Sequence, residues 1–230
     1  MKWGSSPIPR HVRHRTLTHG DVPRWSRGVT VNGLYTLKPA FVAGLRSIED
    51  TAVRRGITAD AVTIAALAVA GVTAAVLVVG TWHPLVWLAV APLSLLRMAC
   101  NAVDGSLARR TGAATRRGWV LNEFGDRVAD TVTFAALAPA VGVLLAMAVV
   151  LTALATSFVA VLAHAVLGER LATGPLGKPD RVAVLSAAAG LAAFAGPSAL
   201  AAGAWTLVAL GVVTLVGRTV VLWRRAGDAA

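Results

Sequence analysis

Acidic residues gather in one short stretch of an otherwise apolar chain. Residues 101–130 contain four of the eleven acidic residues, namely Asp104, Glu123, Asp126 and Asp130. The flanking segments are apolar enough to cross a membrane, where a carboxylate costs about 2.5–3.5 kcal/mol on insertion scales. The cluster therefore needs a compensating interaction. Ion pairs with arginine provide one such interaction (Arg97, Arg109 and Arg127), and a bound cation that faces water provides the other, which we favour.

The spacing of the polar residues places them on two helix faces. Intervals of three and four put one set on a single face: Asn101, Asp104, Gly105, Ala108 and Arg109. Intervals of four put a second set on another face: Asn122, Asp126 and Asp130. The arginine-rich turn at residues 109–117 would let the two faces meet. Carboxylate and amide oxygens suit Mg²⁺ or Mn²⁺, and the lack of a His or Cys cluster in the sequence argues against zinc.

This pattern resembles the signature of the CDP-alcohol phosphotransferases, which are integral membrane enzymes of phospholipid synthesis. The family motif is Asp-x2-Asp-Gly-x2-Ala-Arg-x8-Gly-x3-Asp-x3-Asp. The chain matches six of its eight fixed positions: Asp104, Gly105, Ala108, Arg109, Gly118 and Asp126. Asn101 and Asn122 stand in place of the first and third aspartates. The string LNEFGDRVAD is similar to a bacterial subgroup with asparagine at both positions, and the resemblance extends over most of the chain from about Leu45 onward.

The resemblance implies a reaction and a role for each motif residue. The family transfers a phosphatidyl-type group from a CDP-linked lipid, such as CDP-diacylglycerol, to an alcohol and releases CMP, usually with two divalent ions. By position, Asp126 would be the general base and Asp104 a metal ligand. The remaining motif residues would accommodate the nucleotide: Gly105, Ala108, Arg109 and Gly118. Helix packing and charge pairing are the alternative roles for these four residues. The family is usually homodimeric, and we expect the same here.

The two asparagines leave the motif with two carboxylates instead of four, because an amide oxygen can bind a metal but adds no negative charge. Asp130 could restore the count, since it shares the face of Asn122 and Asp126. Glu123 is a weaker candidate because it lies about 100° from Asn122 around the helix. We predict that Asp104, Asp126 and Asp130 hold at least one Mg²⁺, with Asn101 and Asn122 as neutral ligands.

Composition indicates that membrane helices position these residues. The 230 residues are 56% hydrophobic and 14% charged, with a mean hydropathy of +0.68, which is typical of membrane proteins. Six segments are near the ~20 residues needed to cross the hydrocarbon: about 61–80, 84–108, 119–141, 143–167, 182–200 and 203–223. We therefore predict an all-α integral membrane protein. Its only cysteine, Cys100, precludes an internal disulfide.

Two segments precede the six-helix domain predicted for residues 57–225. Residues 1–33 contain five arginines and are expected to form a flexible basic arm near anionic headgroups. Residues 34–56 include a helical amphipathic pattern, which favours a helix lying in the membrane interface. Its end resembles the family's Gly-(Ile/Leu)-Thr-Pro-Asn sequence, here Gly56-Ile57-Thr58-Ala59-Asp60, with Thr63 following.

Charge predicts the orientation of the six helices. The second and fourth connections carry Arg and Lys, whereas the other three carry neither. By the positive-inside rule, the two basic connections and both termini are cytoplasmic in a multi-pass protein of the plasma or inner membrane. The acidic cluster would then lie at the inner leaflet, where a soluble nucleotide reaches it from the cytosol and lipid tails enter laterally.

The sequence leaves the acceptor open among serine, glycerol phosphate, inositol phosphate and a second lipid. A set of cytoplasmic basic residues could bind an acceptor phosphate, although topology explains them equally well: Arg116, Arg117, Arg127, Lys178 and Arg181. The basic residues flank apolar spans, which argues against nucleic acid as a partner. A catalytically impaired member that binds CDP-lipid or metal without turnover is one alternative, supported by the asparagines. A small transporter is another, supported only by the six spans.

Overall fold

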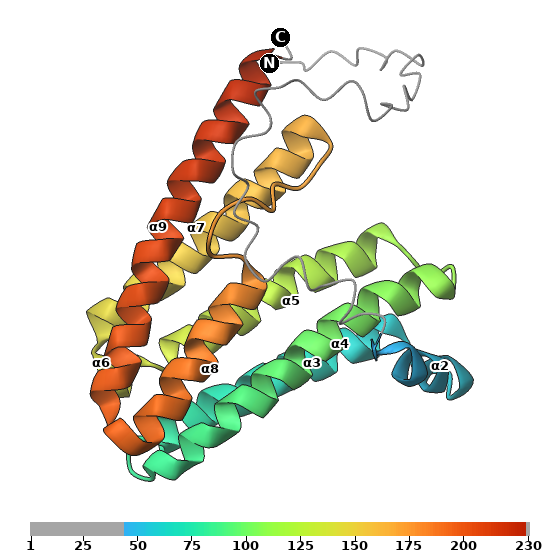
Figure 1. The fold of residues 1–230 in the computed structure, drawn as a ribbon. Coiled ribbons are helices and arrows are strands. Elements are labelled where there is room, and N and C mark those ends of the chain that lie inside the picture. Colours follow the sequence, from blue (N-terminus) through green and yellow to red (C-terminus); the bar gives the residue numbers. More distant parts are fainter. Residues whose placement is uncertain (1–43, 229–230) are drawn as a thin grey trace, which may run out of the picture. The chain divides into compact units, whose positions relative to one another are not determined.

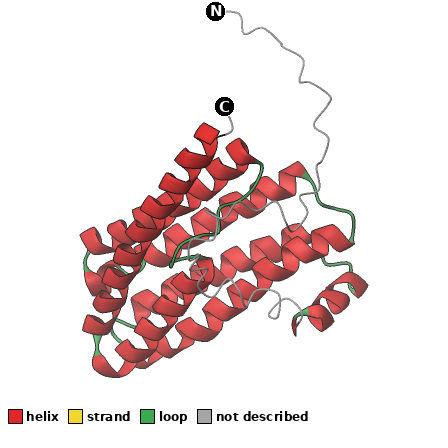
Figure 2. Cartoon of the chain, turned by 45° about the horizontal axis from the view of Figure 1, so that its top comes forward, coloured by secondary structure: helices red, strands yellow, loops and turns green. Residues whose placement is uncertain are grey.

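Helices and their connections make up the computed structural model, which describes residues 44–228 (Figure 1). No strand occurs among these residues (Figure 2), so the all-α prediction is confirmed. The predicted basic arm and the start of the predicted amphipathic segment lie outside the described residues. The elements are α2 (Arg46–Arg54), α3 (Ala59–Val79), the 3₁₀ helix η3 (Pro84–Ala89), α4 (Val90–Arg110), α5 (Arg116–Ala135), α6 (Ala138–Val141), α7 (Val143–Leu167), α8 (Lys178–Ala195) and α9 (Pro197–Asp228).

Four helical segments within residues 44–228 are long and apolar enough to cross a membrane. They are Ala59–Val79, Pro84–Arg110, Val143–Leu167 and Pro197–Asp228. Helices α5 and α8 occupy the third and fifth predicted spans but carry more charge, because the cluster residues and their cationic partners lie on them. The six-span arrangement therefore stays a prediction, whereas a membrane protein with several apolar helices is established.

The helices pack through small and aliphatic side chains. Helix α3 contacts α4 and α5, α8 contacts α4 and α9, and α7 contacts α5 and α9. At the end of α3, the buried Trp87 of η3 donates its Nε1 hydrogen to the carbonyl of Leu77, at 3.0 Å. A Cβ on Gly80 would lie 2.0 Å from Nε1 of the same tryptophan, so only glycine fits there. This packing fixes η3 against the end of α3, directly before α4 begins.

Three predicted spans, the third, fifth and sixth, have different limits in the structure. The third was predicted to continue to residue 141, but α5 ends at Ala135 and a separate short helix follows. Pro139 lacks the N–H that would bond to the carbonyl of Ala135, so the helix cannot continue. The fifth span was predicted to end near residue 200 and the sixth to begin near residue 203, yet the chain reverses at Gly196 (φ +83°) and α9 begins at Pro197. Gly203 lies inside α9.

Helix α2 falls within the segment predicted to be amphipathic and is attached to the end of α4. Glu49 is 4% exposed and accepts a 2.5 Å hydrogen bond from the Ser106 hydroxyl. Arg110 forms ion pairs with Glu49 at 3.2 Å and with Asp50 at 2.6 Å. These contacts fix the cytoplasmic end predicted for α4, where the motif residues lie. The location of α2 in a membrane interface stays a prediction.

Candidate active site

A tight turn brings the two motif faces together. Helix α4 ends at Arg110, Gly112 takes a positive φ of 67°, and α5 begins at Arg116. Thr115 caps α5 by accepting a 3.0 Å hydrogen bond from the Gly118 amide. The end of α4 therefore lies beside the start of α5, as the spacing of the sequence predicts.

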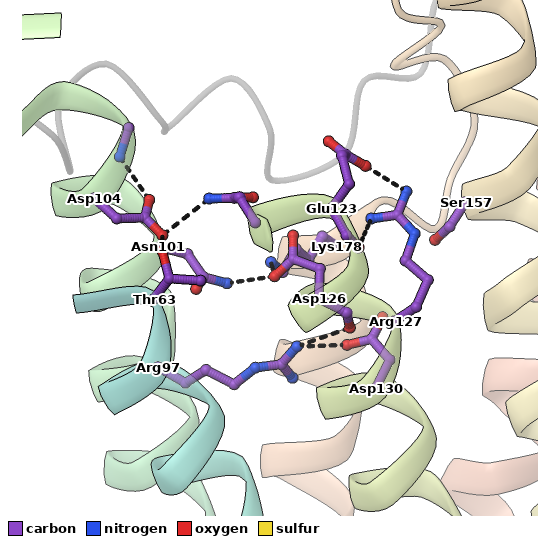
Figure 3. A network of polar contacts seen from close by, with 12 residues as sticks. Thr63, Arg97, Asn101, Asp104, Glu123, Asp126, Arg127, Asp130, Ser157 and Lys178 are labelled. Atoms are coloured by element: carbon purple, nitrogen blue, oxygen red, sulfur yellow. Dashed lines mark hydrogen bonds and ion pairs between the residues drawn. The ribbon is translucent and has the colours of Figure 1, made fainter. Parts of the chain in front are cut away.

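Asp104 of α4 accepts hydrogen bonds from donors on three helices, α3, α4 and α5. Its Oδ2 accepts hydrogen bonds from the Asn122 amide of α5 at 2.9 Å and from the Thr63 hydroxyl of α3 at 2.8 Å (Figure 3). Its Oδ1 accepts from the Gly105 backbone N–H at 2.6 Å. The residue is only 2% exposed. Sequence reasoning noted Thr63 only as part of the lead-in to the first span, and the structure shows its contact with the motif.

Asp126 of α5 has one occupied oxygen and one open oxygen. Its Oδ1 accepts from Asn101 Nδ2 of α4 at 3.0 Å and from Lys178 Nζ of α8 at 2.5 Å (Figure 3). Its Oδ2 makes no hydrogen bond with any residue from 44 to 228, and the side chain is 20% exposed. Asp126 is thus oriented through Oδ1, while Oδ2 has no hydrogen-bond partner among the described residues.

Asp130 does not join these two carboxylates, contrary to our expectation of a third acidic metal ligand. Arg97 Nη2 binds its Oδ1 at 2.8 Å, and Arg181 Nη1 binds its Oδ2 at 3.1 Å. Two guanidinium groups therefore occupy both oxygens one turn below Asp126. Across the described part of the chain, no three His, Cys, Asp or Glu side chains gather in a metal-binding group.

Glu123, the other candidate for a substitute carboxylate, is also occupied. It forms ion pairs with Arg127 on its own helix, at 2.8 Å, and with Arg170 in the connection between α7 and α8. Arg127 and Arg181 therefore serve as partners of acidic side chains, which weakens their candidacy for an acceptor phosphate. Arg116 and Arg117 are exposed at the start of α5.

The small motif residues are not explained by packing alone. A Cβ on Gly105 would meet only Nη1 of Arg109, at an ordinary 3.5 Å. At Gly118 the nearest atoms would be Thr115 Oγ1 at 3.3 Å and Asp60 Oδ1 at 3.5 Å. Ala108 is partly buried, and Arg109 is exposed with no ion pair to any residue between 44 and 228. Space beside Gly105 and a free guanidinium are what a bound nucleotide diphosphate requires.

The donor set fits a hard divalent cation. Four side chains converge from α4 and α5, and all of them offer oxygen: Asp104, Asp126, Asn101 and Asn122. Each asparagine donates through nitrogen to its neighbouring carboxylate, and a half-turn of the amide would present its oxygen instead. Oxygen donors without nitrogen or sulfur suit Mg²⁺ or Mn²⁺.

Comparisons with known proteins agree with this geometry, although no family model matches the chain. The sequence is 34% identical over 153 residues to the inner membrane protein YnbA of Escherichia coli K12, covering 66% of this chain and 76% of that protein. It is 31% identical over 195 residues to a phosphatidylinositol phosphate synthase of Mycolicibacterium smegmatis, covering 79% of this chain and 84% of that enzyme.

The fold is similar to crystal structures of the phosphatidylinositol phosphate synthase PgsA1 of Mycobacterium tuberculosis. The structure with CDP-DAG bound has a TM-score of 0.63 and 28% sequence identity, with 77% of this chain and 92% of that chain covered. The complex with manganese and citrate has a TM-score of 0.63 and 27% identity, with 77% and 88% covered. With the motif residues meeting between α4 and α5, this likeness shows that the chain belongs to the CDP-alcohol phosphotransferase family of membrane enzymes.

Proposed function

We propose that the chain transfers a phosphatidyl or other substituted phosphate group from a CDP-linked lipid, such as CDP-diacylglycerol, to an alcohol and releases CMP. The observation that carries this proposal is the crossed pairing of the two motif halves. Asn122 binds Asp104 at 2.9 Å, and Asn101 binds Asp126 at 3.0 Å. Relatives that are phosphatidylinositol phosphate synthases, one of them crystallised with CDP-DAG, support the same reaction class.

Asp126 is the general base in this proposal. Asn101 and Lys178 hold Oδ1, so Oδ2 is directed to the acceptor hydroxyl and takes its proton. The acceptor oxygen forms a bond to the phosphorus of the lipid-linked phosphate as the bond to the CMP oxygen breaks. CMP leaves with the bond's electron pair, and the proton on Asp126 passes to solvent. Arg109 binds the nucleotide phosphates, and Gly105, Ala108 and Gly118 leave room for the cytidine.

A divalent ion belongs to the same proposal. Asp104, Asp126, Asn101 and Asn122 would hold Mg²⁺ or Mn²⁺, while Asp130 stays with its two arginines. When bound, the ion neutralises the pyrophosphate and the charge that develops on the transferring group. With two carboxylates, the protein itself balances the charge of one divalent cation.

For the acceptor, we propose a phosphate-bearing polyol such as inositol phosphate. The relatives named above support this class, and the exposed Arg116 and Arg117 offer positive charge at the start of α5. We further propose that the site faces the cytoplasm from a six-span homodimer, since the basic connections flank the ends of α4, α5 and α8 that carry the motif and Lys178.

The test is acceptor-dependent release of CMP. Purified protein is incubated with CDP-diacylglycerol, Mg²⁺ and each candidate acceptor: inositol phosphate, glycerol phosphate, serine or a lipid alcohol. Release of CMP with only one acceptor, and its loss in EDTA, is the expected result. Absence of CMP release with every acceptor would contradict the transferase.

A binding protein without turnover is the second candidate, and the two asparagines favour it. They reduce the acidic groups at the motif to two, and no third acidic side chain joins them in the described structure. Tight CDP-lipid binding without CMP release would establish this function. Transport has weaker support, since it rests on the number of spans alone.

A further inference from the structure

Two layers of polar side chains, one helical turn apart, repeat the same arrangement. In the upper layer, Asp126 of α5 accepts from Asn101 of α4 at 3.0 Å and from Lys178 of α8 at 2.5 Å. In the lower layer, Asp130 of α5 is bound by α4 and α8 in the same way, and Figure 3 shows its contact with Arg97 of α4. Its donors are Arg97 at 2.8 Å and Arg181 at 3.1 Å. Each layer is a carboxylate of α5 between donors from α4 and α8.

The two layers are related residue by residue. Arg97 precedes Asn101 by four positions, Asp130 follows Asp126 by four, and Arg181 follows Lys178 by three. Each lower residue therefore lies on the same helix face as its upper counterpart, about one turn away. All three steps lead away from the helix ends that carry the motif. The lower layer thus lies directly beneath the candidate active site.

The lower layer is buried, and it contacts α7 in addition to α4, α5 and α8, the three helices of the upper layer. Its side chains are 8–11% exposed. Arg97 also reaches the Asp126 carbonyl at 3.4 Å, and Arg181 also reaches Ala153 O at 3.2 Å and Ser157 at 3.3 Å on α7. The terminal nitrogens of both arginines are thus bonded to groups on several helices, whereas Arg97 Nε and Arg181 Nε have no partner among the described residues. The lower layer therefore links α4, α5, α7 and α8 through buried polar contacts.

A small cavity borders the lower layer. Its lining includes Arg97, Asp130 and Arg181, with Asn101 and Lys178 of the upper layer, and its volume of about 20 Å³ is room for about one water molecule. The side chains of the lower layer therefore have little free space around them.

We propose that the lower layer, Arg97–Asp130–Arg181, positions Asp126 and Lys178 for group transfer. The lower residues are positioning residues, since they touch neither the open Oδ2 of Asp126 nor the space beside Gly105. This inference rests on the proposed transferase function for its kinetic consequence. Its structural consequence, a fixed first turn of α8 against α5, is independent of that function.

The main variant replaces all three charges together: Arg97→Met, Asp130→Leu and Arg181→Met. Removing only one partner would leave an uncompensated buried charge, whereas apolar residues of similar volume are often tolerated. Arg181→Lys is the conservative second variant, which keeps the charge but loses the guanidinium geometry. Glu169→Gln is the matched control, because it removes the exposed ion pair between Glu169 and Arg225 far along the chain from the motif.

We expect the triple variant to keep a cooperative thermal transition, with kcat lowered about 10–100-fold because small displacements of reacting groups are costly. The KM for the CDP-lipid should change less than about threefold, since the residues proposed to bind the nucleotide lie on the other side of the motif. Arg181→Lys should also lower kcat, by a smaller factor, with little change in KM. The control Glu169→Gln should have the kcat and KM of the wild type. A folded triple variant with wild-type kcat, or an effect on KM alone, would overturn the proposal.

Hydrogen–deuterium exchange gives a readout that does not depend on activity. Amides of residues 182–186, which follow the first hydrogen-bonded amide of α8 at Arg181, should exchange faster in Arg181→Lys than in the wild type, while residues 147–150 of α7 should be unchanged. Equal exchange at residues 182–186 would refute positioning, even if the triple variant failed to fold. If the wild type released no CMP, the transferase proposal would fail. The exchange data would still decide whether the lower layer positions the first turns of α8.

Discussion

Asp126 and Asp104 show what the asparagines contribute at the residue scale. In each pair an amide nitrogen donates to a carboxylate oxygen, at 3.0 Å for Asn101 and 2.9 Å for Asn122. Aspartates at both positions would place like charges at these distances and would repel one another without a cation. The amides therefore allow the two helix faces to meet without a bound cation. They also leave fewer negative charges to attract a metal ion.

The open oxygen of Asp126 leads to a prediction for Asp126→Asn. We expect turnover to fall about 10²–10⁴-fold, because general-base catalysis contributes rate factors of that size. The lipid donor should still bind, since Gly105, Ala108 and Arg109 are unchanged. CMP release and donor binding measure the two effects, with Asp228→Asn at the exposed end of α9 as the control. Turnover near the wild-type rate would rule out Asp126 as the base.

A substitution at Gly105 distinguishes a role in helix packing from a role in substrate binding. Gly105→Ala should keep or raise the thermal midpoint, because the added Cβ meets only Arg109 Nη1 at 3.5 Å and alanine favours a helix by about 1 kcal/mol. The same methyl group should lower the affinity for CDP-lipid. Gly71→Ala, where a Cβ meets nothing within 4 Å, is the matched control. A destabilised Gly105→Ala protein with normal affinity would favour packing instead.

Asn122→Asp tests the metal assignment without an activity assay. The new carboxylate would lie near Asp104 Oδ2, where the amide now donates at 2.9 Å. We expect a lower thermal midpoint in EDTA through like-charge repulsion, and a larger rise on adding Mn²⁺ than in the wild type. Thermal unfolding in detergent with and without the ion gives both values. An Mn²⁺-independent midpoint in both proteins would argue against a metal at this pair.

At the scale of elements, glycine decides how closely α8 and α9 approach. A Cβ on Gly203 of α9 would lie 2.3 Å from the Ala188 Cβ of α8, which is far inside contact distance. The sequence suggested Gly203 as the end of a turn, whereas its position in α9 shows a packing function. Helix α8 ends instead at Gly196, whose φ is positive and which directly precedes Pro197.

Gly203→Ala should therefore destabilise the protein by about 1–3 kcal/mol, the usual range for overpacking. Gly190→Ala in α8 is the control, since nothing lies within 4 Å of its added Cβ, and it should be neutral or stabilising. Chemical denaturation of both variants in the same detergent measures the difference. Equal stability would mean that α8 and α9 separate easily.

At the scale of the whole molecule, the charge of the connections predicts the side of the membrane on which the site lies. The turn between α4 and α5 is flanked by Arg110 at the end of α4 and by Arg116 and Arg117 at the start of α5. The turn before η3, at residues 80–83, carries no Lys or Arg. The positive-inside rule therefore predicts that the first turn lies in the cytoplasm and the second on the opposite side.

Cysteine labelling tests this sidedness. In a Cys100→Ser background, His83→Cys should react with a membrane-impermeant maleimide in intact cells. Ala113→Cys, in the basic turn, should react only after the membrane is opened. Both positions are exposed in the structure, so the difference would report the membrane alone. The reverse pattern would place the candidate site on the outer face and contradict a cytosolic nucleotide donor.

The sequence by itself determined the membrane class, the positions of most helices and the two motif faces. These properties are local, because hydropathy and a period of 3.6 residues depend only on near neighbours. It also identified the family, since fixed residue types at fixed spacing survive when the rest of the chain diverges.

Only the tertiary structure decided which charges meet. Asp126 and Asp130 share one face, and the sequence could not tell which of them faces the cluster. In the fold, Asp130 lies one turn deeper, beside arginines that are 33 and 51 residues away along the chain. A buried carboxylate must find a partner because its desolvation is costly. Which partner it finds depends on helices that pack together from distant parts of the sequence.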